Sequence, residues 1–360
     1  MIGATLARYF ARRFAATMLA AFLIVFALIY TVDLVELLRR GADSPAVHGS
    51  ALAWLAFLRT PLVAEETLPF AALFGAMAVF LNLSRRMELV AARAAGISVW
   101  QFVAPGIAVA LAIGVIATAA YSPLSATMKR RADVLEAELL GNGAQSLRTA
   151  VWLRQRSVDG QAIIHAAARG EAPGDLAMVE VFEFNPLGEF IDRIDAASAR
   201  LEPGRWVLND VKIAAPGSET TSAETFLLAT SLTETEVAQA LAPADTVPFW
   251  SLPEAAELAE GAGIDASEYR LRFQELLARP ALLAAMVLLA ACFSLRFFRM
   301  GGVGIMVSGG VAAGFVLYVL TRLASEFGGV GLIDARTAGW APAIVACLVG
   351  VTALLHLEDG

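Results

Sequence analysis

Six long apolar stretches recur along the chain and are separated by polar connections. They occupy residues 14–32, 66–83, 99–121, 280–298, 303–321 and 338–356. Each is close to the roughly 20 residues that an α-helix needs to cross the hydrocarbon layer of a bilayer. The pattern therefore predicts six transmembrane helices, in two blocks of three that enclose a polar middle segment.

The middle segment, residues 142–250, has the pattern of an antiparallel β domain. Runs such as Met178–Phe184 alternate apolar and polar residues, and turn signals such as Pro203-Gly204 separate them. Short strands at this regular spacing predict a sandwich or an open barrel. Residues 251–279 then take a helical pattern, which predicts a connector that leads into the fourth span.

The predicted organisation therefore has four parts. Residues 1–141 hold the first three spans, 142–250 the β domain, 251–279 the helical connector and 280–360 the last three spans. Composition agrees, because 58% hydrophobic residues and a mean hydropathy of +0.65 are too apolar for a soluble protein of 360 residues. We expect an α-helical membrane protein that carries one soluble β domain.

The chain has no sequence signature of a catalytic or metal site. Its histidines, His48, His165 and His356, are scattered, and it has no Gly-x-Ser-x-Gly motif and no phosphate-binding loop. The net charge of −7 argues against a nucleic-acid partner. We therefore expect no catalytic residue, metal or cofactor on this chain, so that the energy for any active process comes from a partner.

The distribution of arginines predicts the orientation in the membrane. Arginines precede the first span, lie between the second and third spans, and follow the fourth. If the six helices alternate in direction, these three groups lie on the same side of the membrane. The positive-inside rule makes that side cytoplasmic and places the β domain on the other. Two basic groups on the outer side, Arg39-Arg40 and Lys129–Arg131, either snorkel at the interface or form a cationic rim for an anionic amphiphile. The residues alone favour neither interpretation.

The cytoplasmic loop between the second and third spans has an amphipathic pattern. Residues 84–96 predict a short helix that begins at Ser84, as its capping residue, and ends at Gly96. This helix is either an ordinary surface connector or a docking helix for a cytoplasmic partner. In the second interpretation Glu88 is the charged contact.

Several segments together resemble the lipopolysaccharide-export permease family, of the LptF/LptG type, over nearly the whole chain. The segments are Leu6–Phe14, Val32-Asp33, Arg39-Arg40-Gly41, Leu68–Gly75, Ser84–Leu89, Arg93–Gly96, Pro123 with Lys129–Arg131, Tyr269–Pro280 and Gly314–Leu320. Leu68–Gly75 and Tyr269–Pro280 resemble the LptG branch more than the LptF branch.

The resemblance implies a mechanism. In this family two related subunits pair, each with six spans and a periplasmic β-jellyroll, and a dimeric cytoplasmic ATPase that uses ATP and Mg docks on their coupling helices. Lipopolysaccharide enters from the outer leaflet of the inner membrane and passes through the jellyrolls towards the outer membrane. The implied partners are an LptF-like permease subunit, an LptB-like ATPase and LptC-like and LptA-like periplasmic jellyroll proteins. The implied location is the inner membrane of a Gram-negative bacterium, with the β domain in the periplasm.

The resemblance also implies roles for individual residues. Those expected to contact the ATPase are Glu88, Arg85 and Arg86. Those expected to contact the lipid are Asp33, Arg39, Arg40 and Arg130, of which the three arginines face its phosphates. Those expected in a gate are Gly314 and Tyr318, in the fifth span.

Inward-facing strand residues are expected to line an apolar groove for acyl chains. The candidates are Ile163, Val179, Val181 and Phe182, or their neighbours. The alternative is that these residues are simply the core of the β domain. One face of each strand must contribute to that core in any case.

Some positions depart from the family pattern. Tyr30 and Leu62 stand where enterobacterial relatives carry lysines, and Asp133 stands where they carry an arginine. Two other functions stay open: an export permease for another envelope lipid or a lipoprotein, and a non-transporting membrane scaffold whose β domain binds an envelope partner.

Overall fold

The chain folds into two compact units. The computed structural model describes residues 4–41, 48–88, 94, 96–140, 147–157, 160–169, 174–185, 189–216, 220–230, 233, 237, 243–261, 265–298 and 303–359. The first unit, here called the membrane unit, comprises Met1–Ala132, Pro248–Trp250 and Arg270–Gly360. The second, the β unit, comprises Asp133–Val247 and Ser251–Tyr269.

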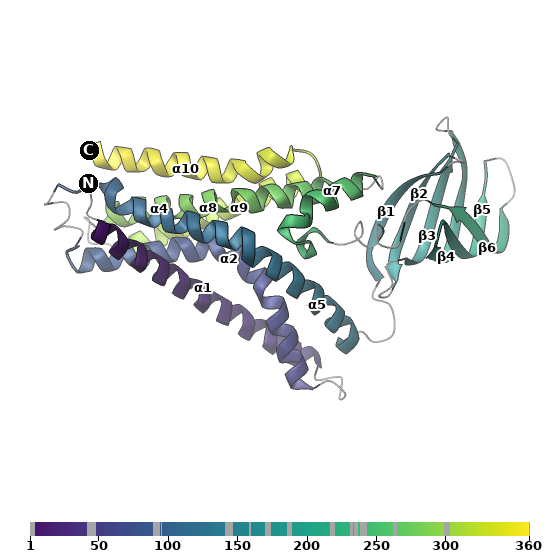
Figure 1. Cartoon of the computed structure of the whole chain (residues 1–360), viewed down its shortest axis with the longest axis horizontal. Coiled ribbons are helices and arrows are strands. Elements are labelled where there is room, and N and C mark those ends of the chain that lie inside the picture. The colour runs from purple at the N-terminus through teal and green to yellow at the C-terminus, as the bar shows by residue number, and fades with distance from the viewer. Residues whose placement is uncertain are drawn as a thin grey trace. The chain divides into compact units, whose positions relative to one another are not determined.

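The membrane unit is built from long helices (Figure 1). They are α1 (Ala4–Gly41), α2 (Gly49–Arg85), α4 (Val99–Ile116), α8 (Ser267–Phe298), α9 (Val303–Gly329) and α10 (Ala335–Asp359). α4 continues through one π-helical turn, η1 (Ala117–Tyr121), into α5 (Ser122–Leu140). Within the described ranges, six helices are long and apolar enough to cross a membrane, which confirms the six predicted spans.

α1 packs against α2 near both of its ends, since Gly41 in its last turn also lies against Leu52 of α2. Phe10, Phe14 and Met18 of α1 are buried, and the ring of Phe14 meets that of Phe80 of α2 edge-on at 5.3 Å. A Cβ atom on Gly75 would lie 2.7 Å from the Cα of Met18, so the glycine allows the two backbones to come this close.

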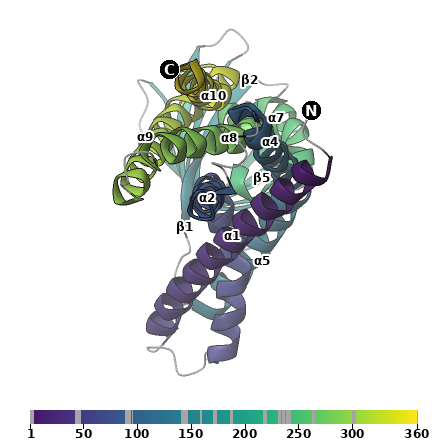
Figure 2. The same cartoon turned by 90° about the vertical axis from the view of Figure 1, so that its left-hand side faces the viewer.

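α8 is the central helix of the membrane unit. Every residue from Leu283 to Cys292 is buried, as expected for a helix that is apolar on all sides. Figure 2 shows α8 between α2 and α4 on one side and α9 and α10 on the other. Its contact with α4 is close, because a Cβ atom on Gly114 would lie 2.4 Å from the Cα of Pro280.

The connections differ from the predicted boundaries. α2 runs on through Arg85, so the predicted start of a new helix at Ser84 is wrong. The helix ends there because Met87 takes a left-handed backbone conformation, with φ of 59°, which an α-helix does not contain. The rest of the predicted 84–96 helix lies mostly outside the described residues.

The β unit contains one antiparallel sheet in which each strand pairs with the next along the chain. The strands are β1 (Leu147–Ser157), β2 (Gly160–Arg169), β3 (Asp175–Phe184), β4 (Phe190–Glu202), β5 (Arg205–Ala214) and β6 (Thr221–Ala229). Figure 1 shows that the sheet is curved. The predicted turn at Pro203-Gly204 joins β4 to β5, and Gly204 has the positive φ of 81° that such a turn requires. A short helix, α7 (Leu252–Gly261), completes the unit.

The two faces of the sheet differ because strand side chains alternate. One face carries a buried apolar cluster that includes Ile164, Val181, Ile194, Trp206 and Leu208. The opposite face is polar and carries ion pairs such as that between Arg193 Nη2 and Glu180 Oε1, at 2.9 Å. The predicted antiparallel β domain is therefore confirmed, with its core on a single face of the described sheet.

The apolar face of the sheet carries an unfavourable carboxyl, since Asp192 lies two residues from Ile194 on β4 and so points to the same face. Asp192 on β4 lies directly opposite Glu183 on β3, and its Oδ1 atom is buried without a hydrogen-bond partner among the described residues. Burial raises the pKa of Asp192, and a hydrogen bond with Glu183 only partly offsets this. The ionised form is therefore disfavoured in the folded state, so the stability of the folded state falls as the pH rises through this raised pKa.

We predict that Asp192→Asn stabilises strands β3 and β4 at about pH 7, and that the gain shrinks at a second, acidic pH below the raised pKa of Asp192, where the aspartate itself becomes neutral. Amide hydrogen exchange of the intact protein, compared with the wild type at each pH, measures this. Asp195→Asn is a matched control on the same strand, since Asp195 accepts a hydrogen bond from Arg193 and its loss should destabilise. Equal protection of wild type and Asp192→Asn at both pH values would contradict the prediction.

Candidate functional site: a charged pocket between membrane helices

A carboxylate is buried inside the membrane unit. Glu65 lies in α2, one turn after Pro61, and its side chain is 0% exposed. An ionised group within membrane-spanning helices is costly unless it is paired, and such groups usually mark a functional site. The partners of Glu65 therefore decide what this part of the molecule does.

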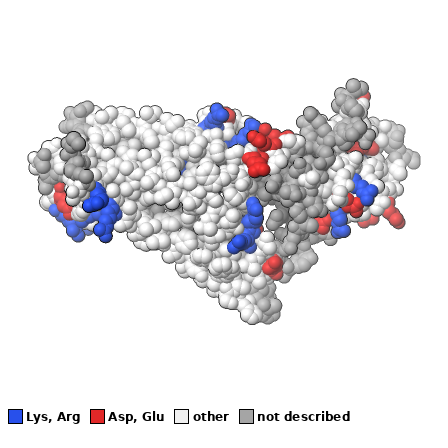
Figure 3. Space-filling view, viewed as in Figure 1, with Lys and Arg blue, Asp and Glu red and all other residues white. Residues whose placement is uncertain are grey.

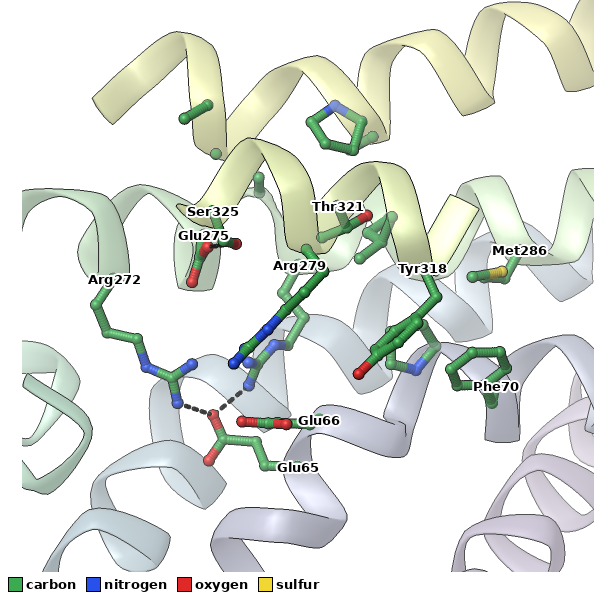
Figure 4. Close-up of a pocket in the computed structure, with 18 residues that line it drawn as sticks. Glu65, Glu66, Phe70, Arg272, Glu275, Arg279, Met286, Tyr318, Thr321 and Ser325 are labelled. Atoms are coloured by element: carbon green, nitrogen blue, oxygen red, sulfur yellow. Dashed lines mark hydrogen bonds and ion pairs between the residues drawn. The ribbon is translucent and has the colours of Figure 1, made fainter. Parts of the chain in front are cut away.

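Two arginines of α8 provide the pairing (Figure 4). Arg272 Nη2 donates to Oε1 of Glu65 at 3.1 Å, and Arg279 Nη1 donates to the same oxygen. Because the arginines are seven residues apart, two helical turns bring both to one face of α8. The hydroxyl of Ser125 on α5 donates to Oε2. Glu65 is therefore bound by three groups that lie 60, 207 and 214 residues away in the chain.

The π-helical turn η1 adds contacts beside this network. Thr118 Oγ1 donates to the carbonyl of Leu276 on α8 at 2.7 Å. Tyr121 Oη donates to the carbonyl of Pro61 on α2 at 3.0 Å. π-Helical turns occur mostly as single insertions in α-helices and often at functional sites. Together with Glu65, these bonds link α2, the α4–α5 helix and α8 into one cross-braced block.

A pocket lies against this block and is closed on its other side by α9 and α10. Its volume is about 120 Å³. One end is charged, with Glu65, Glu66, Arg272 and Arg279, and the other end is apolar, with Phe70 and Met286 (Figure 4). Since a water molecule occupies about 30 Å³ in the liquid, the pocket has room for a few waters or one small polar group. An amphipathic pocket of this kind within membrane helices suits contact with an amphiphile.

The far wall of the pocket carries one of the predicted gate residues. Tyr318 of α9 lines the pocket, and its ring centroid lies 5.6 Å from that of Phe70 on α2. Gly314, one turn earlier, faces α2 as well, since a Cβ atom there would lie 2.5 Å from Leu73 Cδ2. The structure thus brings Gly314 and Tyr318 together at the α2–α9 contact, and their role in a gate stays a prediction.

The residues expected to contact an ATPase lie at the end of α2. Arg85 is in its last turn, and Arg86 Nε donates to Asn82 Oδ1 at 3.1 Å. Glu88 contacts α1, where Tyr9 Oη donates to its Oε2 atom at 3.2 Å. Figure 3 shows basic side chains gathered at this end of the membrane unit.

The residues expected to contact the lipid are paired within the chain. Arg39 and Arg40, at the end of α1, both donate to the carboxylate of Glu36, at 2.8 to 2.9 Å. Both arginines are exposed, at 73% and 51% of their side chains. Asp33 lies 3.8 Å from Arg59 Nε of α2, so it braces α1 against α2. Arg130 lies on α5, on a different helix from the other two cations.

The predicted groove residues fall on opposite faces of the sheet. Val179 and Val181 line an apolar hollow together with Ile164, Leu176, Ala199, Trp206, Leu208 and Leu228. Ile163 on β2 pairs with Phe182 on β3, and this pair is next to the pair of Ile164 and Val181. Because side chains alternate along a strand, Ile163 and Phe182 lie on the polar face. The prediction that all four share one face is therefore wrong for Ile163 and Phe182. The hollow itself is packed with side chains and leaves no room for a water molecule.

Sequence reasoning missed the Glu65 network. The predicted second span begins at residue 66 and the fourth at residue 280, so the prediction places Glu65, Arg272 and Arg279 in the connections. The available signal was the length of α2, which remains helical well before the apolar stretch, and the seven-residue spacing of the two arginines. Within the described residues no group of three His, Cys, Asp or Glu side chains is arranged to hold a metal ion.

These features define a multi-pass membrane protein with an inserted antiparallel β unit. This architecture is that of a permease. The family described as "Lipopolysaccharide export system permease LptF/LptG" matches residues 8–356, and the chain belongs to this family. The match confirms the resemblance found in the sequence.

Two relatives carry the printed name "Lipopolysaccharide export system permease protein LptG". They come from Escherichia coli strain K12 and from Escherichia coli O6:H1 strain CFT073. Each is 24% identical to this chain over 304 residues, which covers 80% of this chain and 80% of the relative.

We predict that Glu65→Gln destabilises the membrane unit by about 3–5 kcal/mol, because two guanidinium groups lose their counter-charge inside the helices. Glu66→Gln is the matched control, since Glu66 is the next residue, lies at the same pocket and is exposed. Thermal unfolding of the purified protein in detergent measures both.

The double variant Glu65→Gln/Arg279→Gln should lose less than the sum of the single variants, because two neutral amides can pair. Glu65→Gln unfolding at the same temperature as Glu66→Gln would show that the buried network does not hold the helices together.

Proposed function

We propose that this chain is a permease subunit of an ATP-driven exporter that takes lipopolysaccharide from the outer leaflet of the inner membrane and passes it through its β unit towards the outer membrane. The observation that carries the proposal is the family match, which extends over both the membrane helices and the β unit. The names of the relatives support lipopolysaccharide as the cargo.

The energy comes from a separate cytoplasmic ATPase. The sequence has no phosphate-binding loop, so this chain does not supply ATP hydrolysis itself. A dimeric, LptB-like ATPase docks at the end of α2, with Glu88 as the charged contact and Arg85 and Arg86 beside it. Each is at or near the end of α2, where basic residues gather. Positive-inside asymmetry supports a cytoplasmic location for this end.

Exposed cations attract the lipid at the other end of the spans. Arg39 and Arg40 share the single carboxylate of Glu36, so the three side chains carry a net positive charge. Phosphates of lipopolysaccharide can displace or share this carboxylate, since guanidinium groups bind phosphate through charge-assisted hydrogen bonds. Arg130 extends the cationic rim from α5. The amphipathic pocket at Tyr318 lies between helices that the lipid passes.

The apolar face of the β unit accepts the acyl chains. Exposing an acyl chain to water costs on the order of 0.8 kcal/mol per CH₂ group, so a continuous apolar cover is needed. The hollow that contains Val179 and Val181 provides apolar side chains from strands β2 to β6. Because this hollow is filled in the present conformation, the side chains or strands must separate before acyl chains enter.

The remaining partners complete the route. A second, LptF-like permease pairs with this chain, and LptC-like and LptA-like periplasmic jellyroll proteins take the lipid from the β unit. The pairing accounts for the exposed apolar side chains of α1 and α9, which need either lipid or a protein partner to cover them.

The experiment that tests the proposal is purification of the tagged chain from native membranes with mild detergent. We expect a second six-span permease, a small ATPase and lipopolysaccharide in stoichiometric amounts. Glu88→Ala should lower the amount of ATPase recovered while the permease partner remains, because the carboxylate proposed to dock the ATPase is lost. Recovery of the chain without any ATPase would favour a scaffold, and recovery of a different lipid would change the cargo.

We predict that a photo-crosslinking residue at Val181 forms adducts with lipopolysaccharide during export, whereas one at Phe182 does not. The two positions are neighbours on β3 and differ only in the face of the sheet they occupy. Detection of lipopolysaccharide on the crosslinked chain by immunoblotting measures this. Adducts at Phe182 alone, or at both positions equally, would refute the apolar hollow as the path.

A further inference from the structure

Three side chains form a compact contact between α1 and Glu88, which lies three residues beyond the end of α2 at Arg85. Tyr9 and Arg13 are four residues apart, so they lie on the same face of α1. Tyr9 Oη donates to Glu88 Oε2 at 3.2 Å, and Arg13 Nη1 lies 3.5 Å from the same oxygen. The guanidinium carbon of Arg13 is also 4.7 Å from the centroid of the Tyr9 ring, within the range of a cation–π interaction.

This contact leaves part of Glu88 available. Its side chain is 31% exposed, and the contacts with α1 use Oε2. A carboxylate accepts hydrogen bonds at both oxygens. Glu88 can therefore hold α1 through Oε2 while Oε1 accepts a donor from a docked protein.

α1 is built to transmit a displacement along its length. It is one unbroken helix of 38 residues with no proline, about 57 Å long at 1.5 Å per residue. Tyr9 and Arg13 lie near its beginning, and Arg39 and Arg40 lie in its last turn. One rigid helix thus carries both the contact with Glu88 and the exposed cations.

The middle of α1 has few buried side chains within this chain. Phe10, Phe14 and Met18 are buried against neighbouring helices, but none of the residues between Met18 and Leu37 is buried. The helix is held again at its far end, where Asp33 pairs with Arg59 and Leu37 is buried, so only the stretch between the two ends is lightly packed by this chain.

We propose that Tyr9 and Arg13 are positioning residues that couple Glu88 to α1, so that movement of the docked ATPase displaces α1 and with it Arg39 and Arg40. The inference rests on the proposed function, because it takes Glu88 as the docking carboxylate. It adds that the first span is the element that receives the motion, through a contact between side chains rather than through the connecting backbone.

The test uses the full transporter, with both permeases and the ATPase, reconstituted in vesicles that contain lipopolysaccharide. A soluble jellyroll acceptor collects the released lipid. The readout is the ratio of lipopolysaccharide released to ATP hydrolysed, which a general loss of stability does not change. We expect Arg13→Gln to lower this ratio roughly two- to fivefold, which is the effect expected when a partly exposed ion pair is lost. Arg13→Lys, which keeps the charge, should restore most of it.

Arg12→Gln is the matched control. Arg12 is the adjacent residue with the same charge, is exposed, and makes no ion pair with a described carboxylate. Tyr9→Phe removes only the hydroxyl that donates to Glu88, and it tests the same contact if Arg13→Gln accumulates poorly. The amount of ATPase recovered with each variant is measured in parallel.

The outcomes separate the two proposals. Wild-type complex that releases no lipopolysaccharide with ATP overturns the proposed function. Wild-type export with an unchanged ratio in both Arg13→Gln and Tyr9→Phe overturns the coupling role alone. A fall in the ratio for Arg12→Gln as large as that for Arg13→Gln also overturns it, since the effect would then come from the charge of this end of α1. A loss of ATPase recovery in Arg13→Gln that accounts for the whole effect assigns Arg13 to docking instead.

Discussion

The membrane unit depends on one buried ion network. Glu65 has no exposed surface, so its charge must be neutralised by the protein rather than by water. Arg272 and Arg279 meet this requirement from α8, and Ser125 completes the set from α5. Because an unpaired charge in this environment is costly, the network determines how three helices from both halves of the chain are aligned. The pocket beside it exists because α9 and α10 pack against this block without filling the space.

The membrane helices are held unequally. α8 is surrounded and buried, whereas α1 is anchored near its beginning and braced to α2 by Asp33 and Arg59 farther along. α8 is therefore the fixed part of the unit, and α1 can be displaced at a lower cost in free energy, since regions with few buried contacts are the ones that move. The charged contact at Glu88 joins the shiftable helix to the end of α2 that we assign to ATPase docking.

The two faces of the β unit differ because side chains alternate along its strands. Strands β2 to β6 direct one set of side chains to the apolar cluster, and β3 and β4 carry ion pairs on the other face, so a single sheet has one apolar and one polar face. Trp206 and Ile164 fill the hollow at present. The proposed passage of acyl chains therefore requires this face to exchange its own packing contacts for those of the lipid.

The sequence by itself determined the features that depend on local pattern. Apolar stretches near the length of a bilayer identified six spans, alternation identified the strands, and the ordered segments identified the family. Tertiary structure decided what depends on distant partners. Glu65 and Arg279 meet across 214 residues, and Glu88 meets Tyr9 across 79. Alternation puts the neighbours Val181 and Phe182 on opposite faces, but only the packing of the sheet shows which of the two faces holds the core. Local periodicity says which residues share an element and a face, but only packing shows which elements meet and which charges must pair.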